Sequence, residues 1–209
     1  MSTVKIENIS KKFGSKEIFK NFNMEIEEGD FVCISGESGK GKSTLLNMIG
    51  LLDMPDSGNI IINGKKNVKF SSKDGRELMK NKISYIFQNF GLVDDQTVEY
   101  NLKISGKFSG KNKKNDLENA LERVGLNKNM LNQKIFTLSG GEQQRVALAR
   151  IYLKDSDMIL ADEPTGSLDA NNRNKVMEIL KDLNNSGKTV VIVTHDEEVV
   201  KCAKRTVKI

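Results

Sequence analysis

The chain has 209 residues, of which 37% are hydrophobic and 29% are charged. This length suits a single domain that buries a sizeable core, and the hydrophobic share excludes an intrinsically disordered chain. The 33 basic and 28 acidic residues leave a net charge of only +5. Because lysine supplies most of the positive charge, we expect an ordinary solvated surface and no nucleic-acid partner.

The apolar and cysteine patterns exclude further classes. No apolar run approaches the ~20 residues that cross a bilayer, and the first ten residues lack the basic flank and apolar stretch of a secretory signal. Cys33 and Cys202 lie far apart and form no CxxC motif, so we expect neither a disulfide nor a metal site. Cys33 lies in the apolar run FVCIS, which predicts a buried side chain. This cysteine usage indicates a reducing, cytoplasmic compartment.

The first third of the chain predicts short strands around one helix. Apolar residues alternate with polar ones in the first two segments, and a compact apolar run then precedes a glycine-rich stretch. A helical run follows that stretch, and an Asn63-Gly64 turn signal closes the next strand. The expected elements are strands over residues 4–9, 19–26, 31–35 and 60–62 and a helix over residues 43–51.

The rest of the chain alternates helices with buried strands, which indicates a parallel α/β sheet. Its mostly helical middle resembles an insertion, and the lysine-rich stretch 107–115 predicts a solvated loop, with contact to anionic lipid or a membrane partner as the alternative. Gly125 is expected to end the helix that begins at Asp116. The expected elements are helices over residues 116–124, 142–152 and 172–183 and strands over residues 158–161 and 189–194.

Residues 36–44, GESGKGKST, match the pattern GxxxxGK[ST] between a predicted strand and a predicted helix. The three glycines let the backbone curl so that successive N–H groups point at phosphate oxygens, and the helix N-terminus adds partial positive charge. Lys42 can neutralise the β- and γ-phosphates, and Ser43 can offer its hydroxyl to Mg²⁺. The alternative is a glycine-rich turn that binds nothing.

Two acids and a histidine follow buried strands later in the chain. In the stretch MILADE, Asp162 could hold the hydration shell of Mg²⁺ and Glu163 could orient and polarise an attacking water. Acids also occur at ordinary turns, which is the alternative for this pair. His195 comes directly after the strand 189–194, where open α/β sheets bind ligands. We expect it to contact phosphate, and a purely structural histidine is the alternative.

Residues 138–145, LSGGEQQR, precede a predicted helix. Ser139 and the two glycines after it would offer a hydroxyl and free N–H groups to an anion. Ser139 with Glu142 also makes an ordinary capping box, and both interpretations can hold together. Because the chain has a single phosphate loop, a second phosphate clamp suggests that two subunits share each nucleotide.

Taken in order, GESGKGKST, Gln88, LSGGEQQR, MILADEPTGSLD and His195 resemble the nucleotide-binding subunit of an ABC transporter over essentially the whole chain. LLDMPDSG and ADEPTGSLD resemble the branch for macrolide export, lipoprotein release and antimicrobial-peptide resistance, with the cell-division ATPase close by. The resemblance implies an α/β P-loop NTPase fold. That fold has a RecA-like parallel sheet, an N-terminal antiparallel β portion and a helical subdomain over residues 90–150, inserted into a core of residues 1–89 and 151–209.

The resemblance also implies roles for residues. Gln88 would contact Mg²⁺ or water beside Ser43 and Asp162, while Glu163 and His195 would act on the γ-phosphate. Phe13 falls where the family places an adenine-stacking aromatic, and plain core packing is its alternative. Residues 167–169 would form the D-loop at a dimer seam. The nucleotide contacts implied are Phe13, Gly36, Ser38, Gly39, Lys40, Gly41, Lys42, Ser43, Thr44, Ser139, Gly140, Gly141, Glu142 and Asp169.

The function implied is hydrolysis of ATP with Mg²⁺ by an ATP-dependent head-to-tail homodimer on the cytoplasmic face of the membrane. A separate permease subunit would export a substrate or confer drug or antimicrobial-peptide resistance. One alternative is a mechanotransmitting ATPase of the cell-division type, which signals without transport. Another is a soluble ABC ATPase of DNA repair or translation, which a single cassette with a short insertion disfavours. The chain ends soon after His195, so we expect no regulatory C-terminal domain.

Overall fold

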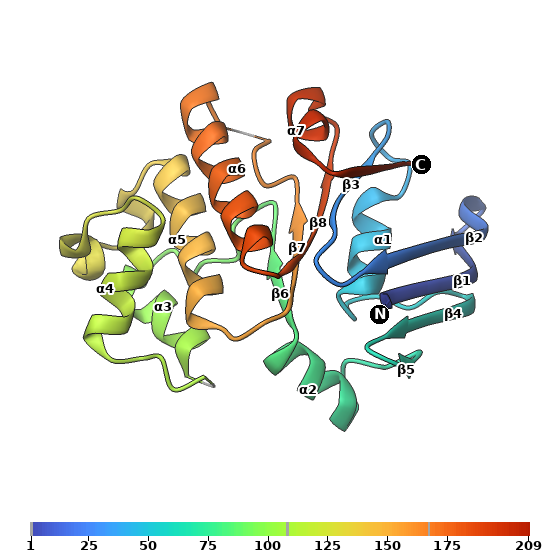
Figure 1. Ribbon diagram of the computed structural model, residues 1–209, viewed down its shortest axis with the longest axis horizontal. Coiled ribbons are helices and arrows are strands. Elements are labelled where there is room, and N and C mark those ends of the chain that lie inside the picture. Colours follow the sequence, from blue (N-terminus) through green and yellow to red (C-terminus); the bar gives the residue numbers. More distant parts are fainter. Residues whose placement is uncertain (1, 108, 167) are drawn as a thin grey trace.

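The computed structural model describes residues 2–107, 109–166 and 168–209, which form two sheets and their covering helices (Figure 1). An antiparallel sheet has the order β2-β1-β4-β5, made of β1 (Ser2–Phe13), β2 (Lys16–Glu27), β4 (Ser57–Ile62) and β5 (Lys65–Lys66). A parallel sheet has the order β6-β7-β8-β3-β9, made of β3 (Phe31–Ser35), β6 (Ile83–Ile86), β7 (Met158–Asp162), β8 (Thr189–Thr194) and β9 (Arg205–Lys208). The fold class expected from the sequence is confirmed.

Both faces of the parallel sheet are buried, because successive side chains of its strands enter two different cores. On one face, Ile159 and Ile192 belong to a core that continues into the helices. On the other face, Leu160 and Val191 pack with α1 (Lys42–Ile49) and the antiparallel sheet. The parallel sheet is therefore the middle layer. Cys33 in β3 is fully buried, as expected.

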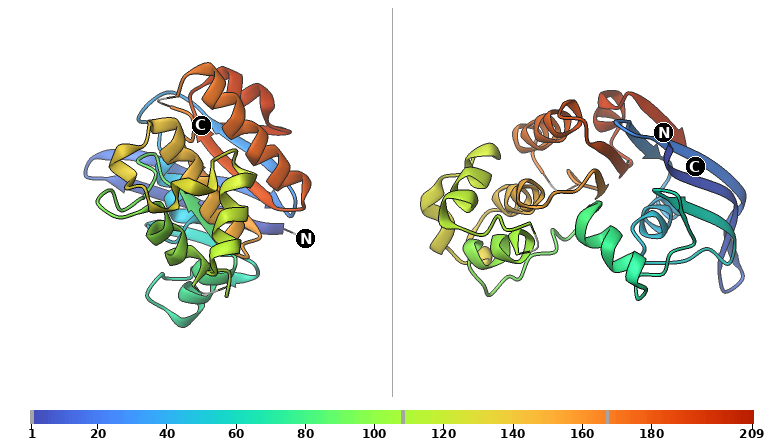
Figure 2. Two further views of the ribbon diagram at one scale, coloured as in Figure 1. Left: turned by 90° about the vertical axis from the view of Figure 1, so that its left-hand side faces the viewer. Right: turned by 60° about the horizontal axis from the view of Figure 1, so that its bottom comes forward.

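Helix α2 (Lys73–Asn81) packs through Leu78 into the same core as α1. The helices after β6 cover the other face of the sheet and one end of the molecule, opposite the antiparallel strands (Figures 1 and 2). Helices α3 (Val98–Gly106) and α4 (Lys114–Arg123) both pack on α5 (Gly140–Leu153), which also contacts α6 (Ala170–Asn185). The segment 90–150 thus holds α3, α4, two 3-10 turns and most of α5. The helices are α2 (Lys73–Asn81), α3 (Val98–Gly106), α4 (Lys114–Arg123), α5 (Gly140–Leu153), α6 (Ala170–Asn185) and α7 (Glu197–Cys202), with turns η1 (Lys128–Asn132) and η2 (Ile135–Thr137).

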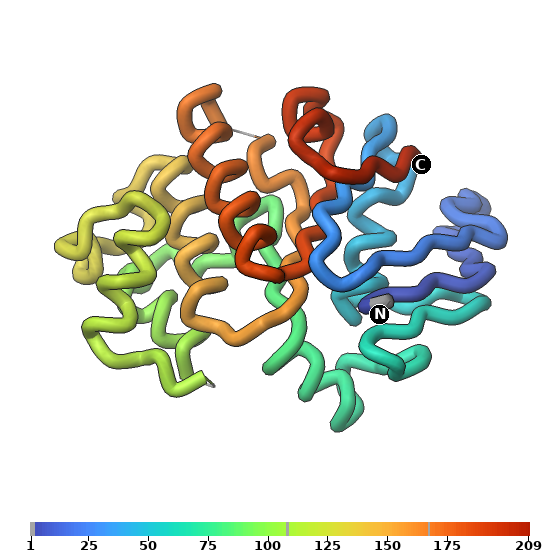
Figure 3. The backbone as a smooth tube through the Cα atoms, viewed as in Figure 1, coloured from blue at the N-terminus to red at the C-terminus, as the bar shows by residue number. Residues whose placement is uncertain are grey.

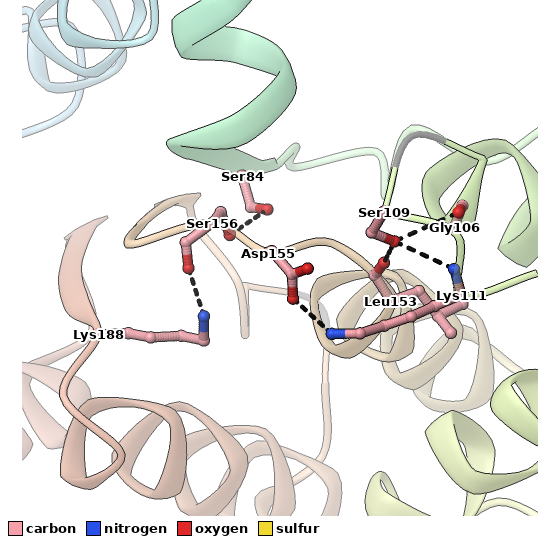
Figure 4. Close-up of polar contacts among 8 residues, drawn as sticks. All are labelled: Ser84, Gly106, Ser109, Lys111, Leu153, Asp155, Ser156 and Lys188. Carbon is pink, nitrogen blue, oxygen red and sulfur yellow. Dashed lines mark hydrogen bonds and ion pairs between the residues drawn. The ribbon is translucent and has the colours of Figure 1, made fainter.

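A polar cluster ties the end of α5 to its neighbours (Figure 4). Ser109 donates to the carbonyl of Leu153, and Lys111 pairs with Asp155, so the loop after α3 is held to the last turn of α5. Directly after Asp155, Ser156 has a buried hydroxyl that lies 2.7 Å from the buried hydroxyl of Ser84 in β6. These contacts fix where α5 ends and where β7 enters the sheet.

The observed elements differ from the expected ones in informative places. The first helix was expected to reach Leu51 but ends at Ile49, because Leu51 has a left-handed φ of 60°. The loop expected over residues 107–115 ends earlier, since α4 begins at Lys114. Gly125, with φ of 68°, follows α4 as expected. The elements that the sequence patterns did not predict are β5, α2, β6, α3, both 3-10 turns, α7 and β9.

The parallel topology brings the carboxyl ends of β3, β6, β7 and β8 to one edge of the sheet. The chain returns to this edge at its end: β9 lies beside β3, and the N–H of Ile209 donates to the carbonyl of Ser35 at 2.9 Å (Figure 3). In the described part of the chain, no helix has the length and apolar composition required to span a membrane.

Candidate functional site

The loop between β3 and α1 has the curled backbone that its glycines predict. Gly36, Gly39 and Gly41 have φ values of 156°, 78° and 101°, on the left-handed side that favours glycine. Gly41 also caps α1 without a side-chain hydrogen bond, so the first-turn N–H groups remain available to an anion. A Cβ on Gly41 would lie 2.3 Å from Cγ2 of Ile18. Both conformation and packing therefore require glycine here.

Two side chains of the first turn of α1 point into the loop and toward the sheet. Nζ of Lys42 donates to the carbonyls of Gly36 and Glu37, each at 2.9 Å, and Lys42 is only 7% exposed. Oγ of Ser43 donates to Oδ1 of Asp162 at 2.9 Å. This hydrogen bond joins the end of β7 to the first turn of α1, directly after the glycine-rich loop.

The carboxyl end of β7 carries two acids in different environments. Burial raises the pKa of Asp162, and the hydrogen bond from Ser43 opposes that shift. Glu163 has a left-handed φ of 44°, which is uncommon for a residue with a side chain, and its N–H donates to the carbonyl of Val193 at 2.9 Å. This hydrogen bond holds the strained residue against β8.

The carboxylate of Glu163 is held by two residues at the end of β8. Oγ1 of Thr194 donates to Oε2 at 2.9 Å, and Nδ1 of His195 lies 2.7 Å from Oε1. Thr194 is fully buried and also accepts a hydrogen bond from the N–H of Asp196. Thr194 was predicted only as a strand residue. The one available signal was a hydroxyl at the last position of β8, after four apolar residues.

The glycine-rich loop, Glu163 and His195 border a common cavity of about 300 Å³. Phe13 lines this cavity and is 53% exposed, so the core-packing alternative for Phe13 is wrong. Gly36, Lys40 and Asp162 belong to the same region but do not line the cavity. Its walls are formed by Phe13, Ile18, Ser38, Gly39, Gly41, Lys42, Ser43, Thr44, Gln88, Glu163 and His195.

The oxygen atoms at this site suit a small divalent cation. The Ser43 hydroxyl adjoins the Asp162 carboxylate, and the side-chain amide of Gln88 belongs to the same cavity wall. Mg²⁺ prefers such oxygen ligands and usually completes its shell with water and phosphate. Within residues 2–107, 109–166 and 168–209, no group of three or more His, Cys, Asp or Glu residues could hold a metal ion. The donor set present therefore fits Mg²⁺ held together with a phosphate ligand.

The LSGGEQ residues lie elsewhere in the chain. Ser139 caps α5: its N–H donates to Oε2 of Glu142 at 2.8 Å, and the reciprocal bond completes the expected capping box. The Ser139 hydroxyl, which donates to Oε2 of Glu142 at 2.7 Å, and then the Ser139 N–H lower the pKa of Glu142. The cavity beside the glycine-rich loop is not lined by any of these LSGGEQ residues, Ser139, Gly140, Gly141 and Glu142.

The third expected segment also lies outside that cavity. Asp169 caps α6, and its Oδ1 accepts from the N–H of Asn172 at 3.0 Å. Ser167, which was expected in the same D-loop, lies outside the described residues. Within one chain, therefore, neither the LSGGEQ residues nor Asp169 line the cavity beside the glycine-rich loop.

Comparison with known proteins bears on these arrangements. The family model described as "ABC transporter" matches residues 19–166. The ABC transporter ATP-binding protein MJ0796 of Methanocaldococcus jannaschii is 42% identical over 218 residues, covering 98% of this chain and 92% of that protein. The macrolide export ATP-binding/permease protein MacB of Mannheimia succiniciproducens is 39% identical over 216 residues, covering 100% of this chain and 33% of that protein. The chain thus spans about a third of the length of this macrolide export relative.

A solved structure is similar throughout. A dimeric structure of a post-hydrolysis state of the ATP-binding cassette MJ0796, bound to ADP and Pi, has a TM-score of 0.88 and 38% identity, covering 99% of this chain and 94% of that chain. The sequence-based resemblance to the ABC transporter family and to its macrolide-export branch is confirmed by these relatives.

The packing of Gly41 predicts a stability difference between two glycines. Gly41→Ala should lower the free energy of unfolding by about 2–3 kcal/mol, because a left-handed residue gains a Cβ that also displaces Ile18. Gly187→Ala is the matched control: its φ is 96°, but nothing lies within 4 Å of its Cβ, so the loss should be only ~1 kcal/mol. Denaturant unfolding measures both. Equal losses would show that packing against Ile18 contributes nothing.

Proposed function

The chain belongs to the ABC transporter family of ATP-binding proteins, and we propose that it hydrolyses ATP with Mg²⁺ to drive a separate membrane permease. The observation that carries this proposal is the cavity at the carboxyl edge of the parallel sheet, where the glycine-rich loop meets Glu163 and His195. The ATPase would act on the cytoplasmic face of the membrane. Export or drug resistance is the process we favour, since several relatives are named macrolide export proteins.

In this proposal the cavity holds the nucleotide from one end to the other. The exposed ring of Phe13 stacks on adenine, and the curled loop binds the phosphates with its N–H groups. Lys42 turns its ammonium from the loop carbonyls toward the β- and γ-phosphates. Ser43, Gln88 and Asp162 would hold Mg²⁺, which would neutralise charge on the phosphates.

Glu163 is the proposed general base. Its carboxylate accepts a proton from water as the water oxygen bonds to the γ-phosphorus, and the bond from that phosphorus to the ADP oxygen breaks. Thr194 and His195 hold the two carboxylate oxygens from one side, which orients the group before the reaction. With Nδ1 of His195 beside Glu163, Nε2 is the ring nitrogen that would face the γ-phosphate.

The partner surface proposed is the segment after Gln88 together with α3. Val93, Tyr100 and Ile104 are 40%, 47% and 42% exposed, although all three are large and apolar. Beside them, a groove of about 470 Å³ runs between α2 and the pair α3–α5, lined by Phe70, Arg76, Met79, Lys80, Ile104, Ser105, Arg150 and Lys154. We propose that the lobe 90–150 docks there on a cytoplasmic helix of the permease.

Arg150 links this groove to the segment that follows Gln88. Its Nη1 donates to the carbonyl of Gly91 at 2.6 Å and its Nε to Oγ of Ser105 at 2.9 Å. Movement of the docking surface would therefore reach the loop that carries Gln88. A mechanotransmitting role without transport uses the same surface, and the fold of the membrane partner distinguishes the two functions.

Glu163→Gln should reduce ATP hydrolysis by roughly 10²–10⁴-fold while ATP still binds, because the amide keeps the shape of the carboxylate but cannot take the proton. Steady-state turnover and ATP affinity measure the two effects separately. Glu178→Gln, on the exposed face of α6, is the matched control and should retain full turnover. Lys42→Ala should instead weaken ATP binding, since it removes a charge from the phosphates. Full turnover of Glu163→Gln would refute the assignment of the base.

Substitutions within residues 90–95 and on α3 should abolish co-purification with the permease while sparing basal ATPase activity. Val93→Asp and Ile104→Glu place a charge on the exposed apolar surface, which the partner would have to desolvate. Asn185→Asp adds the same charge at an exposed site on α6 and should leave the complex intact. The experiment is affinity purification after gentle detergent extraction. The transport proposal loses its main support if the wild-type chain retains no membrane protein.

The dimer should form only with ATP, because one chain carries the phosphate loop and LSGGEQ at separate places. A head-to-tail pair about a two-fold axis would bring each loop to the Ser139 of the other subunit. The wild-type chain should be monomeric without nucleotide, and Glu163→Gln with ATP should accumulate as a dimer. Adding Ser139→Arg should abolish that dimer, whereas adding Ser71→Arg, at an exposed serine before α2, should not.

Size-exclusion chromatography with light scattering measures each of these states. A dimer that forms without ATP, or one that tolerates Ser139→Arg, is incompatible with a shared nucleotide site.

A further inference from the structure

A side-chain amide lies between the two segments that do not reach the nucleotide cavity. Asn172, in the first turn of α6, donates from Nδ2 to Oδ2 of Asp169 at 2.6 Å. Its Oδ1 accepts from Nη1 of Arg145, on α5, also at 2.6 Å. The side-chain amide of Asn172 therefore links Asp169, the N-cap of α6, to Arg145 of α5, the helix that starts within LSGGEQ.

The first turn of α5 packs against the same amide. A Cβ on Gly141 would lie 2.6 Å from Cγ of Asn172 and 2.8 Å from both of its terminal atoms. No side chain fits there without moving Asn172, so the backbone of Gly141 and the amide are in close contact. Gly141 has this packing reason to be glycine in addition to any contact with a nucleotide.

The partners also fix which way the amide points. A guanidinium only donates and an ionised carboxylate only accepts, so the carbonyl of Asn172 must face Arg145 and its NH₂ must face Asp169. Hydrogen bonds from the backbone N–H and then from the side-chain amide of Asn172 lower the pKa of Asp169. Arg145 is 8% exposed, so this hydrogen bond is made in the interior.

We propose that Asn172 is a positioning residue for ATP hydrolysis, holding the LSGGEQ turn of α5 and the Asp169 cap of α6 as one rigid unit. The inference rests on the proposed head-to-tail dimer, in which each chain presents both segments to the nucleotide of its partner. The two segments come from different helices, and the amide of Asn172 hydrogen-bonds both Arg145 of α5 and Asp169 of α6. Asn172 touches no part of the cavity that binds the chain's own nucleotide.

Asn172→Ala should lower kcat about tenfold and leave the KM for ATP within about twofold, because binding to the chain's own loop is unaffected. In the Glu163→Gln background, the same substitution should raise the ATP concentration needed for half-dimerisation. Asn171→Ala, one residue earlier and exposed, is the matched control and should behave as wild type in both assays. A kcat for Asn172→Ala equal to that of Asn171→Ala would overturn the proposal.

A double-mutant cycle with Gly141 tests the geometry and does not depend on activity. Gly141→Ala should lower the melting temperature in the wild-type background but much less in the Asn172→Ala background, since the clashing amide is then absent. Additive losses would show that the two residues are not in contact. Because the cycle compares melting temperatures, its result stays valid even if Asn172→Ala has no ATPase activity. Failure of Glu163→Gln to dimerise with ATP counts against the proposed function, whereas normal dimerisation of Glu163→Gln with Asn172→Ala counts only against the role of Asn172.

Discussion

The burial of the parallel sheet on both faces is the constraint from which the site follows. In β7 and β8 nearly every side chain lies in one of two cores, so polar groups can emerge only where the strands end. The register pairs Ser35 with Thr194 and Asp162 with Val193, which places the ends of three strands within one short edge. A shifted strand would expose apolar side chains and bury charged ones, so the hydrophobic pattern that holds the sheet together also aligns the reactive groups.

Local strain at that edge is supported by the same layers. Glu163 adopts a left-handed backbone, which costs of order 1 kcal/mol for a residue with a side chain. Its N–H continues the hydrogen bonding to β8 at Val193, and its carboxylate is held by Thr194 and His195. The strain turns the carboxylate away from the sheet and toward the cavity, where a flat continuation of β7 would not direct it. The contacts with the end of β8 therefore preorganise the candidate base.

Local sequence patterns predicted the glycine-rich loop and the helix cap, whereas several short elements of the fold carried no such pattern. The glycine-rich loop, the acids after β7 and the serine cap of α5 each depend on residues within ten positions, so their spacing alone is informative. The strand β6 has only four residues, ISYI, in which apolar and polar side chains do not alternate regularly. Neither this strand nor the helix before it was therefore predicted. The bond of Thr194 to Glu163 and that of Asn172 to Arg145 join residues 31 and 27 positions apart. Such contacts depend on the packed sheet and helices and have no local signal.

The two segments of the proposed nucleotide site are built on separate parts of the fold. The loop side, with Lys42 and Ser43, is built on the carboxyl edge of the sheet, while Ser139 caps a helix that packs on α3, α4 and α6. Since the two are held by different layers, they do not meet within one chain. In the proposed dimer, a second copy would supply the donors that each loop lacks, and the phosphate charge would become part of the interface, so hydrolysis would change the interaction energy of the dimer directly. Asn172 joins α5 to the cap of α6, and Arg150 joins α5 to Ser105 of α3 and to Gly91, so these contacts would make separate helices respond together to that change.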